Sequence, residues 1–401
     1  MWQLYLRGGE IMPRSSGAMS VLAKRVLGLA VLLSLLVCAL GWWRSRPRYV
    51  FFRAIEAIRT GDFAQAQSDF ALLEGQSGSE QYVDCLRGAF LLRSGRIPEA
   101  LRCFSRRRPE GEIRPTALLM TGQCLYQTGR LVEAEWTLSQ LTAEEPRNAE
   151  GHRWLGIVYH DLGAMDAAIC ELEAALNADP GDWQPHGLLA QIYFDVEQYA
   201  QAAEHYRHVV AHHSDLTATQ KLAVSLVRLQ RFRDALDVLE HVTRSTETLI
   251  LMAECHLALN SPARARQFLE EARSIDAGAH SVLLLSARMS LDAREPKAAA
   301  LFLRQALIQD PHDCQTRYQL ALSHRDQGLL GEYAEEMSRL EMSQKLHDQY
   351  TELSRQARQR PSDSQVRDEL YEVAQKLGKP EIARLWKRAA DAFRQVSDAP
   401  H

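Results

Sequence analysis

The chain has 401 residues, a net charge of -4 and 46% hydrophobic residues. This composition is typical of a helical protein with a continuous core, and it excludes a disordered chain. The small negative charge gives no support for a nucleic acid partner. The seven cysteines show no paired spacing of the kind found in zinc sites, so we expect most of them to fill core positions.

An apolar segment near the N-terminus follows residues 1–18, which we expect to be an unstructured extension. Residues 26–43 contain no charged side chain. With residues 19–23 added, the stretch approaches the length that a helix needs to cross a bilayer. The sequence therefore predicts a single-pass transmembrane anchor over residues 19–43, and this arrangement favours a bacterial inner-membrane protein.

A cleaved signal peptide is the alternative to an anchor, because it has the same basic flank and apolar core. Trp42 and Trp43 favour retention, since tryptophan concentrates at membrane borders. Basic residues are balanced across the segment, with Arg7, Arg14, Lys24 and Arg25 before it and Arg44, Arg46, Arg48 and Arg53 after it. Both orientations of the rest of the chain therefore stay open.

The remaining chain repeats one pattern about every 34 residues. The pattern is clearest in residues 149–182, where Gly156 lies on a first predicted helix, Gly163 interrupts the chain and Ala168 opens a second helix. The small residue of the first helix recurs as Ala54, Gly88, Gly122, Gly156, Ala190, Ala223, Ala253, Ala287 and Ala321, with Tyr371 in the last unit. An alanine follows 12 residues later at Ala66, Ala100, Ala134, Ala168, Ala202, Ala235, Ala265, Ala299 and Ala383. Small residues at both places let two helices approach closely.

This pattern resembles the tetratricopeptide repeat, in which two antiparallel helices fill one period. The resemblance implies an all-α fold: a right-handed superhelical α-solenoid of about ten helix-turn-helix repeats, preceded by the single transmembrane helix. The first nine predicted units span residues 47–347, as 47–80, 81–114, 115–148, 149–182, 183–215, 216–245, 246–279, 280–313 and 314–347.

The end of the chain departs from the regular period. The spacing before the last unit is 16 residues longer than the others, and the segment preceding it has no glycine or proline, so we expect a helical insertion at 348–363. The last unit, 364–397, is polar and has Lys387 where earlier units are apolar. We therefore expect a solvent-facing capping repeat, which a repeat array needs at its open end. Residues 398–401 are expected to form a frayed tail.

The sequence contains no phosphate-binding loop, nucleophile elbow or zinc-protease motif. We therefore predict that the chain is not an enzyme and takes no cofactor. In tetratricopeptide repeat proteins the first helices line a concave groove that binds peptides or helices. Carried over to this chain, the resemblance implies a groove lined by Gln123, Tyr126, Arg153, Ile157, His160, Gln191, Phe194, Glu254, Arg288 and Arg325.

These observations predict a membrane-anchored, non-catalytic scaffold whose groove binds a protein or peptide partner. The alternative is a regulatory or substrate-presenting subunit of a separate envelope enzyme of the glycosyl- or sulfotransferase type. One cluster suggests different chemistry, because His205, His208 and His212 share a face of one predicted helix and imidazoles so placed can bind a transition metal. Since Ala202 and Tyr206 take the inward positions of that helix, we favour an outward, solvated face and predict no metal site.

Overall fold

The computed structural model describes residues 46–106, 109–213, 215–360 and 362–397. Within these ranges the chain forms twenty α-helices and one short 3-10 helix, with no strand. The predicted extension and membrane segment, and the predicted tail, lie outside the described residues. Among the helices that are described, none is long and apolar enough to cross a membrane.

The helices fall into two compact units that divide after Ile113. The first contains α2 (Pro47–Thr60), α3 (Phe63–Glu74), α4 (Glu80–Arg93), α5 (Ile97–Arg106) and the 3-10 helix Gly111–Ile113. The second contains α6 (Arg114–Gln127), α7 (Leu131–Glu144), α8 (Ala149–Asp161), α9 (Met165–Ala178), α10 (Gln184–Asp195), α11 (Tyr199–His212), α12 (Leu216–Arg228), α13 (Phe232–Leu239), α14 (Thr246–Ala258), α15 (Pro262–Ile275), α16 (His280–Asp292), α17 (Pro296–Gln309), α18 (Cys314–Asp326), α19 (Leu330–Gln359), α20 (Ser364–Lys376) and α21 (Pro380–Ser397).

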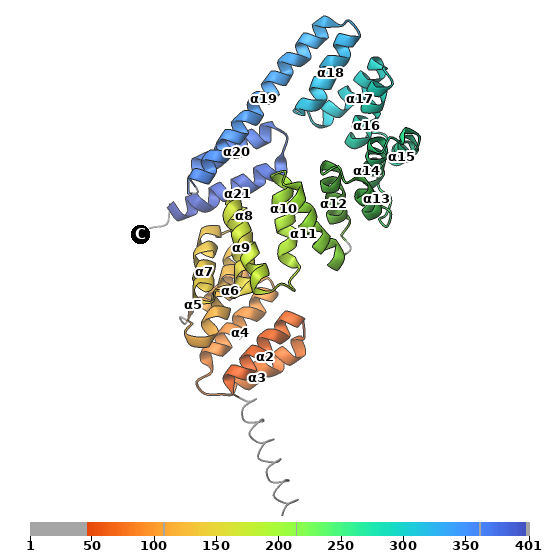
Figure 1. The fold of residues 1–401 in the computed structure, drawn as a ribbon. Coiled ribbons are helices and arrows are strands. Elements are labelled where there is room, and N and C mark those ends of the chain that lie inside the picture. Colours follow the sequence, from red (N-terminus) through yellow and green to blue (C-terminus); the bar gives the residue numbers. More distant parts are fainter. Residues whose placement is uncertain (1–45, 107–108, 214, 361, 398–401) are drawn as a thin grey trace, which may run out of the picture. The chain divides into compact units, whose positions relative to one another are not determined.

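Consecutive helices pack as pairs (Figure 1), and the pairs α4–α5, α6–α7 and α8–α9 have the same internal contact. A small residue on the first helix faces a bulky residue 16 positions later on the second. A Cβ atom added to Gly122 would lie 2.5 Å from Leu138, and one added to Gly156 would lie 2.7 Å from Leu172. No larger side chain fits there without a shift, because protein cores are closely packed. The predicted all-α array of helix pairs is confirmed.

Each pair also has the same turn between its two helices. One residue of the turn adopts a left-handed backbone conformation, at Gly61, Gly95, Gly129, Gly163, Glu197, Gln230, Asn260, Arg294, Gly328 and Gly378. Glycine reaches this conformation without steric cost, whereas other residues are strained in it. The positions are spaced as the repeats are, so one turn geometry reverses the chain in every described pair.

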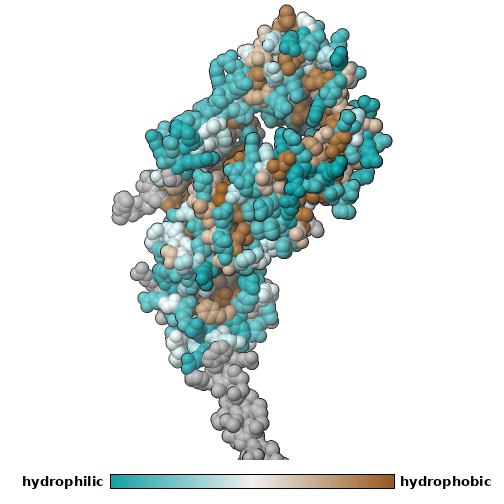
Figure 2. Space-filling model, in the orientation of Figure 1, coloured by the Kyte–Doolittle hydropathy of each residue, from teal (hydrophilic) through white to brown (hydrophobic). Residues whose placement is uncertain are grey.

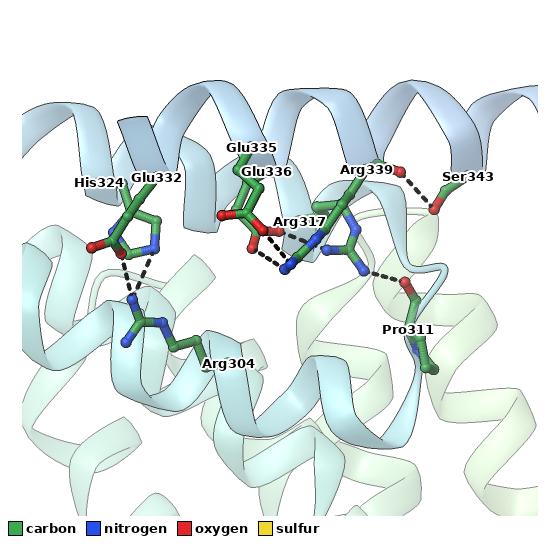
Figure 3. Close-up of polar contacts among 9 residues, drawn as sticks. All are labelled: Arg304, Pro311, Arg317, His324, Glu332, Glu335, Glu336, Arg339 and Ser343. Atoms are coloured by element: carbon green, nitrogen blue, oxygen red, sulfur yellow. Dashed lines mark hydrogen bonds and ion pairs between the residues drawn. The ribbon is translucent and has the colours of Figure 1, made fainter. Parts of the chain in front are cut away.

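The helix α19 is 30 residues long and contains the extra residues that precede the last unit. At 1.5 Å per residue, it extends over roughly 45 Å. Its first half is held to α17 and α18 by an ion-pair network (Figure 3). Arg317 and Glu336 are both buried and 2.6 Å apart, and Arg317 also donates to the carbonyl of Pro311. Beside them, Arg304 pairs with Glu332 at 2.6 Å.

The second half of α19 packs with the last two helices. Leu353 and Ala357 of α19 share a core with Leu370 of α20 and Trp386 of α21. The last unit differs from the expected cap at an open end, because α21 also contacts α7 and α8 of the same compact unit (Figure 1). Lys387 itself is half-exposed and lies 3.7 Å from Asp368 and 3.3 Å from Asp391.

The buried pair on α18 and α19 gives a first prediction. The substitution Glu336→Ala leaves the Arg317 guanidinium buried without its carboxylate, so we expect the free energy of unfolding to fall by about 3–5 kcal/mol. Urea unfolding of the full chain measures this change. The double variant Arg317→Met with Glu336→Leu, which removes both charges and keeps the volume, is expected to recover most of the loss. Equal destabilisation by the two variants would contradict the assigned role of the pair.

Candidate interaction surface

The first helices of successive pairs contact one another, α6 with α8, α10 with α12, α12 with α14, and α14 with α16. We call the exposed side of this row the first-helix face. All ten residues predicted to line a groove lie on first helices, in α6, α8, α10, α14, α16 and α18. Their contacts bring some of them together in three groups along the row.

The first group joins α6 to α8. The amide of Gln123 donates to Glu150 at 3.3 Å, and a guanidinium nitrogen of Arg153 lies 3.7 Å from the same carboxylate. The Arg153 Nε atom is buried and 3.8 Å from Asp182, which is too far for a hydrogen bond. A buried donor without a partner is costly. The Arg153 side chain as a whole is 20% exposed, so a carboxylate or carbonyl of a bound chain can reach the guanidinium from its exposed part.

The second group joins α10 to α12. The ammonium group of Lys221 donates to Gln191 and lies 5.6 Å from the ring centre of Phe194. The Phe194 ring meets Tyr206 edge-on, with ring centres 6.2 Å apart. These contacts place a cation, an amide and an aromatic ring side by side on two neighbouring first helices, a combination that suits mixed polar and apolar contacts with a peptide.

The third group spans α12, α14 and α16. Burial raises the pKa of Glu254, while the positive charges of Arg288 and Arg228 act in the opposite direction. Charges of alternating sign therefore cross three consecutive first helices. Of the other predicted residues, Arg325 is exposed and pairs with Asp326 on its own helix at 3.1 Å.

Three contributors to this face were not identified from the sequence. Lys221 and Arg228 lie on α12, in the shortened repeat from which no groove residue was predicted. Lys221 lies two residues before Ala223 and Arg228 five residues after it, and these positions relative to the small residue could have identified both. Tyr318 of α18 lines a cleft of about 750 Å³ together with Cys314, Gln315, Met337, Ser338, Leu340, Glu341 and Gln344. Its position three residues before Ala321 corresponds to that of Arg153 before Gly156.

One end of the first-helix face is already occupied by the chain itself. The Tyr126 hydroxyl of α6 donates to Asp161 of α8 at 2.9 Å. Arg388 of α21 lies 2.5 Å from Asp161, and its guanidinium carbon is 4.9 Å from the centre of the Tyr126 ring. The predicted residue His160 also contacts Asp161, at 3.0 Å. Two predicted groove residues therefore meet around a carboxylate that binds the last helix.

Two family models, both described as tetratricopeptide repeat, match this chain at residues 87–138 and 125–192. This part of the chain consists of tetratricopeptide repeats. The helix pairs that follow, through α21, have the same left-handed turn position. No curated protein matches the chain.

Several solved structures are similar to parts of the chain, and two of those described below are named as tetratricopeptide repeat proteins. A protein from Parabacteroides merdae has 15% identity and a TM-score of 0.40, and the match covers 61% of this chain and 99% of that one. MamA from MSR-1 has 23% identity and a TM-score of 0.36, with 41% and 98% covered. The C-terminal part of a repeat protein from Cytophaga hutchinsonii has 15% identity and a TM-score of 0.45, with 58% and 98% covered. Similarities at this level carry no argument about function.

The three histidines singled out from the sequence lie on α11, and His186 of α10 contacts His205 and His208. The Nδ1 atoms of His186 and His205 are 2.7 Å apart, and the ring of His208 stacks on His186 at 4.1 Å. The Nδ1 atom of His212 contacts the carbonyl of His208 at 2.9 Å. In the described part of the chain, no group of three or more potential ligands is arranged to hold a metal ion.

The histidine stack makes the stability of this repeat depend on pH. Burial, followed by the charges of His208 and His205, lowers the pKa of His186 from 6.5 to about 4. In the unfolded chain His186 therefore binds a proton near pH 6.5, whereas in the folded chain it binds one only near pH 4. The stack contributes its full stability above pH 6.5, and the contribution is lost as the pH falls toward 4.

We expect the variant His186→Gln to lose less stability than the wild type between pH 7 and pH 4. The difference should be on the order of 1 kcal/mol, since the side chain is only half-buried. Urea unfolding at several pH values measures it. The exposed His241 provides a matched control, because His241→Gln should keep the wild-type pH dependence. A parallel loss in all three proteins would show that the stack does not control it.

Proposed function

We propose that this protein is a membrane-anchored, non-catalytic scaffold that binds a protein partner along its first-helix face. Tetratricopeptide repeats bind protein partners in general, and the matched repeats include Gln123, Tyr126 and Arg153. The observation that carries the proposal is Arg153, a largely buried guanidinium whose carboxylate neighbours lie 3.7 and 3.8 Å away. The N–H groups of this guanidinium are held in place but lack acceptors at hydrogen-bond distance among the described residues, as in a surface that completes its hydrogen bonds when a partner binds.

The rest of the face supports a peptide or helical segment as the partner. The three groups around Arg153, Phe194 and Glu254 follow one another along the row of first helices. A bound segment would therefore meet a cation, then an aromatic ring and then an acidic group along its length. Backbone amides and carbonyls of an extended chain can use such mixed side chains, and aromatic and arginine residues supply most of the affinity in protein interfaces.

The membrane part of the proposal rests on the apolar sequence of residues 19–43 and the flanking tryptophans. An anchor there would hold the repeats next to the bilayer, at whichever side they lie. The scaffold would then gather its partner at the membrane surface, where confinement raises the effective concentration of both proteins.

The first-helix face is tested by capture of partners from a detergent extract with the full chain. The charge reversal Arg153→Glu and the truncation Phe194→Ala should each reduce the captured partner by roughly tenfold, because each removes an anchoring contact. The control Arg207→Glu changes an exposed arginine of the second helix α11 by the same charge. An identical set of partners for all variants would reject the first-helix face as the binding surface.

The anchor is tested separately by alkaline extraction of membranes. The full chain should stay with the lipid, whereas a variant carrying Leu33→Arg and Leu36→Arg should be released, since each charge in the centre of a membrane helix costs about 2.5–3.5 kcal/mol. Leu33→Ala with Leu36→Ala serves as a control that keeps the segment apolar. Release of the unaltered chain would reject the anchor and leave the binding surface to be judged on its own.

A further inference from the structure

A polar contact recurs inside several helix pairs. It joins the residue four positions before the small residue of the first helix to the residue 19 positions later on the second. His152 contacts Glu171 at 2.6 Å in one repeat, and His186 contacts His205 at 2.7 Å in the next. Arg317 and Glu336 form the same contact at 2.6 Å in the ninth. Each repeat of this kind satisfies its own buried polar group.

The last repeat breaks this rule. Arg367 of α20 has the position of Arg317, but the residue 19 positions later is Trp386, which offers no carboxylate. Arg367 is nevertheless only 1% exposed. One guanidinium nitrogen donates to the carbonyl of Asp363 in the same repeat at 3.0 Å. The other donates to the carbonyl of Leu162, at 3.2 Å and 205 residues earlier in the chain, and the guanidinium lies 4.6 Å from the ring centre of Phe393. The buried guanidinium of the last repeat therefore has part of its hydrogen bonding in a distant repeat.

Trp386 also contacts this distant repeat, at Gly163 next to Leu162. A Cβ atom added to Gly163, in the turn after α8, would lie 2.5 Å from the Trp386 ring. The indole nitrogen donates to the hydroxyl of Tyr350 at 3.1 Å, which fixes the ring against the turn. Gly163 therefore meets two requirements at once, a left-handed backbone with φ of 76° and room for an indole. By comparison, the equivalent Gly129 has the same φ and nothing within 4 Å.

These contacts form a clasp, made by Arg367, Trp386 and Arg388 against Tyr126, Asp161, Leu162 and Gly163. The clasp is mostly polar, and the Arg388 side chain is 42% exposed. The apolar core of the last repeat lies among α19, α20 and α21, and Trp386 belongs to it together with Leu353, Val366, Leu370 and Val373. Opening the clasp would separate Trp386 from the Gly163 turn, whereas its contacts within α19, α20 and α21 can stay in place because they lie inside the last repeat.

We propose that α21 is a displaceable internal ligand of the first-helix face. Its docking site recognises a helix that presents a tryptophan and, two residues later, an arginine. The inference rests on the proposed function, because Tyr126 belongs to the face assigned to the partner. In the closed chain this end of the face is filled by Arg388, so a partner with the same chemistry competes with α21 and gains access when the clasp opens.

A synthetic peptide of residues 380–397 tests the site on the full chain. The variant Arg388→Glu places a carboxylate opposite Asp161, so the clasp should open and the labelled peptide should bind roughly tenfold or more tightly than to the wild type. The variant Asp161→Arg should open the clasp equally but bind no peptide, because the recognising carboxylate is gone. Amide hydrogen exchange at residues 158–166 reports opening in both variants without any ligand.

A glycine pair provides the matched steric control. Gly163→Ala and Gly129→Ala introduce the same left-handed strain, of about 1 kcal/mol or more. Only Gly163→Ala also collides with Trp386, so only this variant should raise hydrogen exchange in α21 and admit the peptide. Equal peptide binding by the wild type and Arg388→Glu, or equal exchange for the two alanine variants, would overturn the clasp.

Partner capture then separates this inference from the proposed function. With the clasp open, Arg388→Glu should capture several-fold more of the partner than the wild type does. Unchanged capture by Arg388→Glu, when Arg153→Glu abolishes capture, would overturn the competition and keep the binding face. Unchanged capture by Arg153→Glu would reject the binding face, while peptide binding and hydrogen exchange would still show whether the clasp opens.

Discussion

The contact between a small residue on each first helix and a bulky one on the second sets the spacing of the helix pairs. Gly122 against Leu138 and Gly156 against Leu172 bring two backbones close enough that a single added carbon would collide. Because this packing uses the inner side of both helices, the opposite side of each first helix is free to carry other groups. The charged and aromatic residues of the first-helix face depend on this division, since they need no role in the core.

The period of the sequence was sufficient to predict the helix pairs, because small and large residues recur at fixed separations. It also placed all ten proposed groove residues on first helices. The shortened repeat containing Lys221 lacked a closing proline and a regular length, so its contribution to the face was missed. The clasp was beyond reach for a different reason. Its contacts join residues more than 200 positions apart, and no local pattern encodes which surfaces meet after many repeats have stacked.

The last repeat shows how the polarity of a segment can mislead. The polar composition of the last unit, with Lys387 at a position that is apolar in earlier units, predicts a solvent-facing cap, which is a common role for a terminal repeat. Arg388 instead lies between Asp161 and the Tyr126 ring, and Arg367 is buried against a backbone carbonyl. Both arginines form charge-assisted or cation-π contacts that require a specific partner. The extra residues of α19 provide the length that brings these arginines back to α8.

A linear array of repeats unfolds from its ends, because a terminal repeat has one neighbour and each inner repeat has two. The clasp gives the last repeat of the second unit an additional neighbour, so this unit lacks an ordinary fraying end on that side. Four consecutive turns in its middle hold the non-glycine residues Glu197, Gln230, Asn260 and Arg294 in the left-handed conformation. Backbone strain is therefore greater in these middle turns than in the turns at either end of the unit, where glycine holds the same position. Opening of the clasp would remove that neighbour and return the last repeat to the position of an ordinary terminal repeat, which frays first.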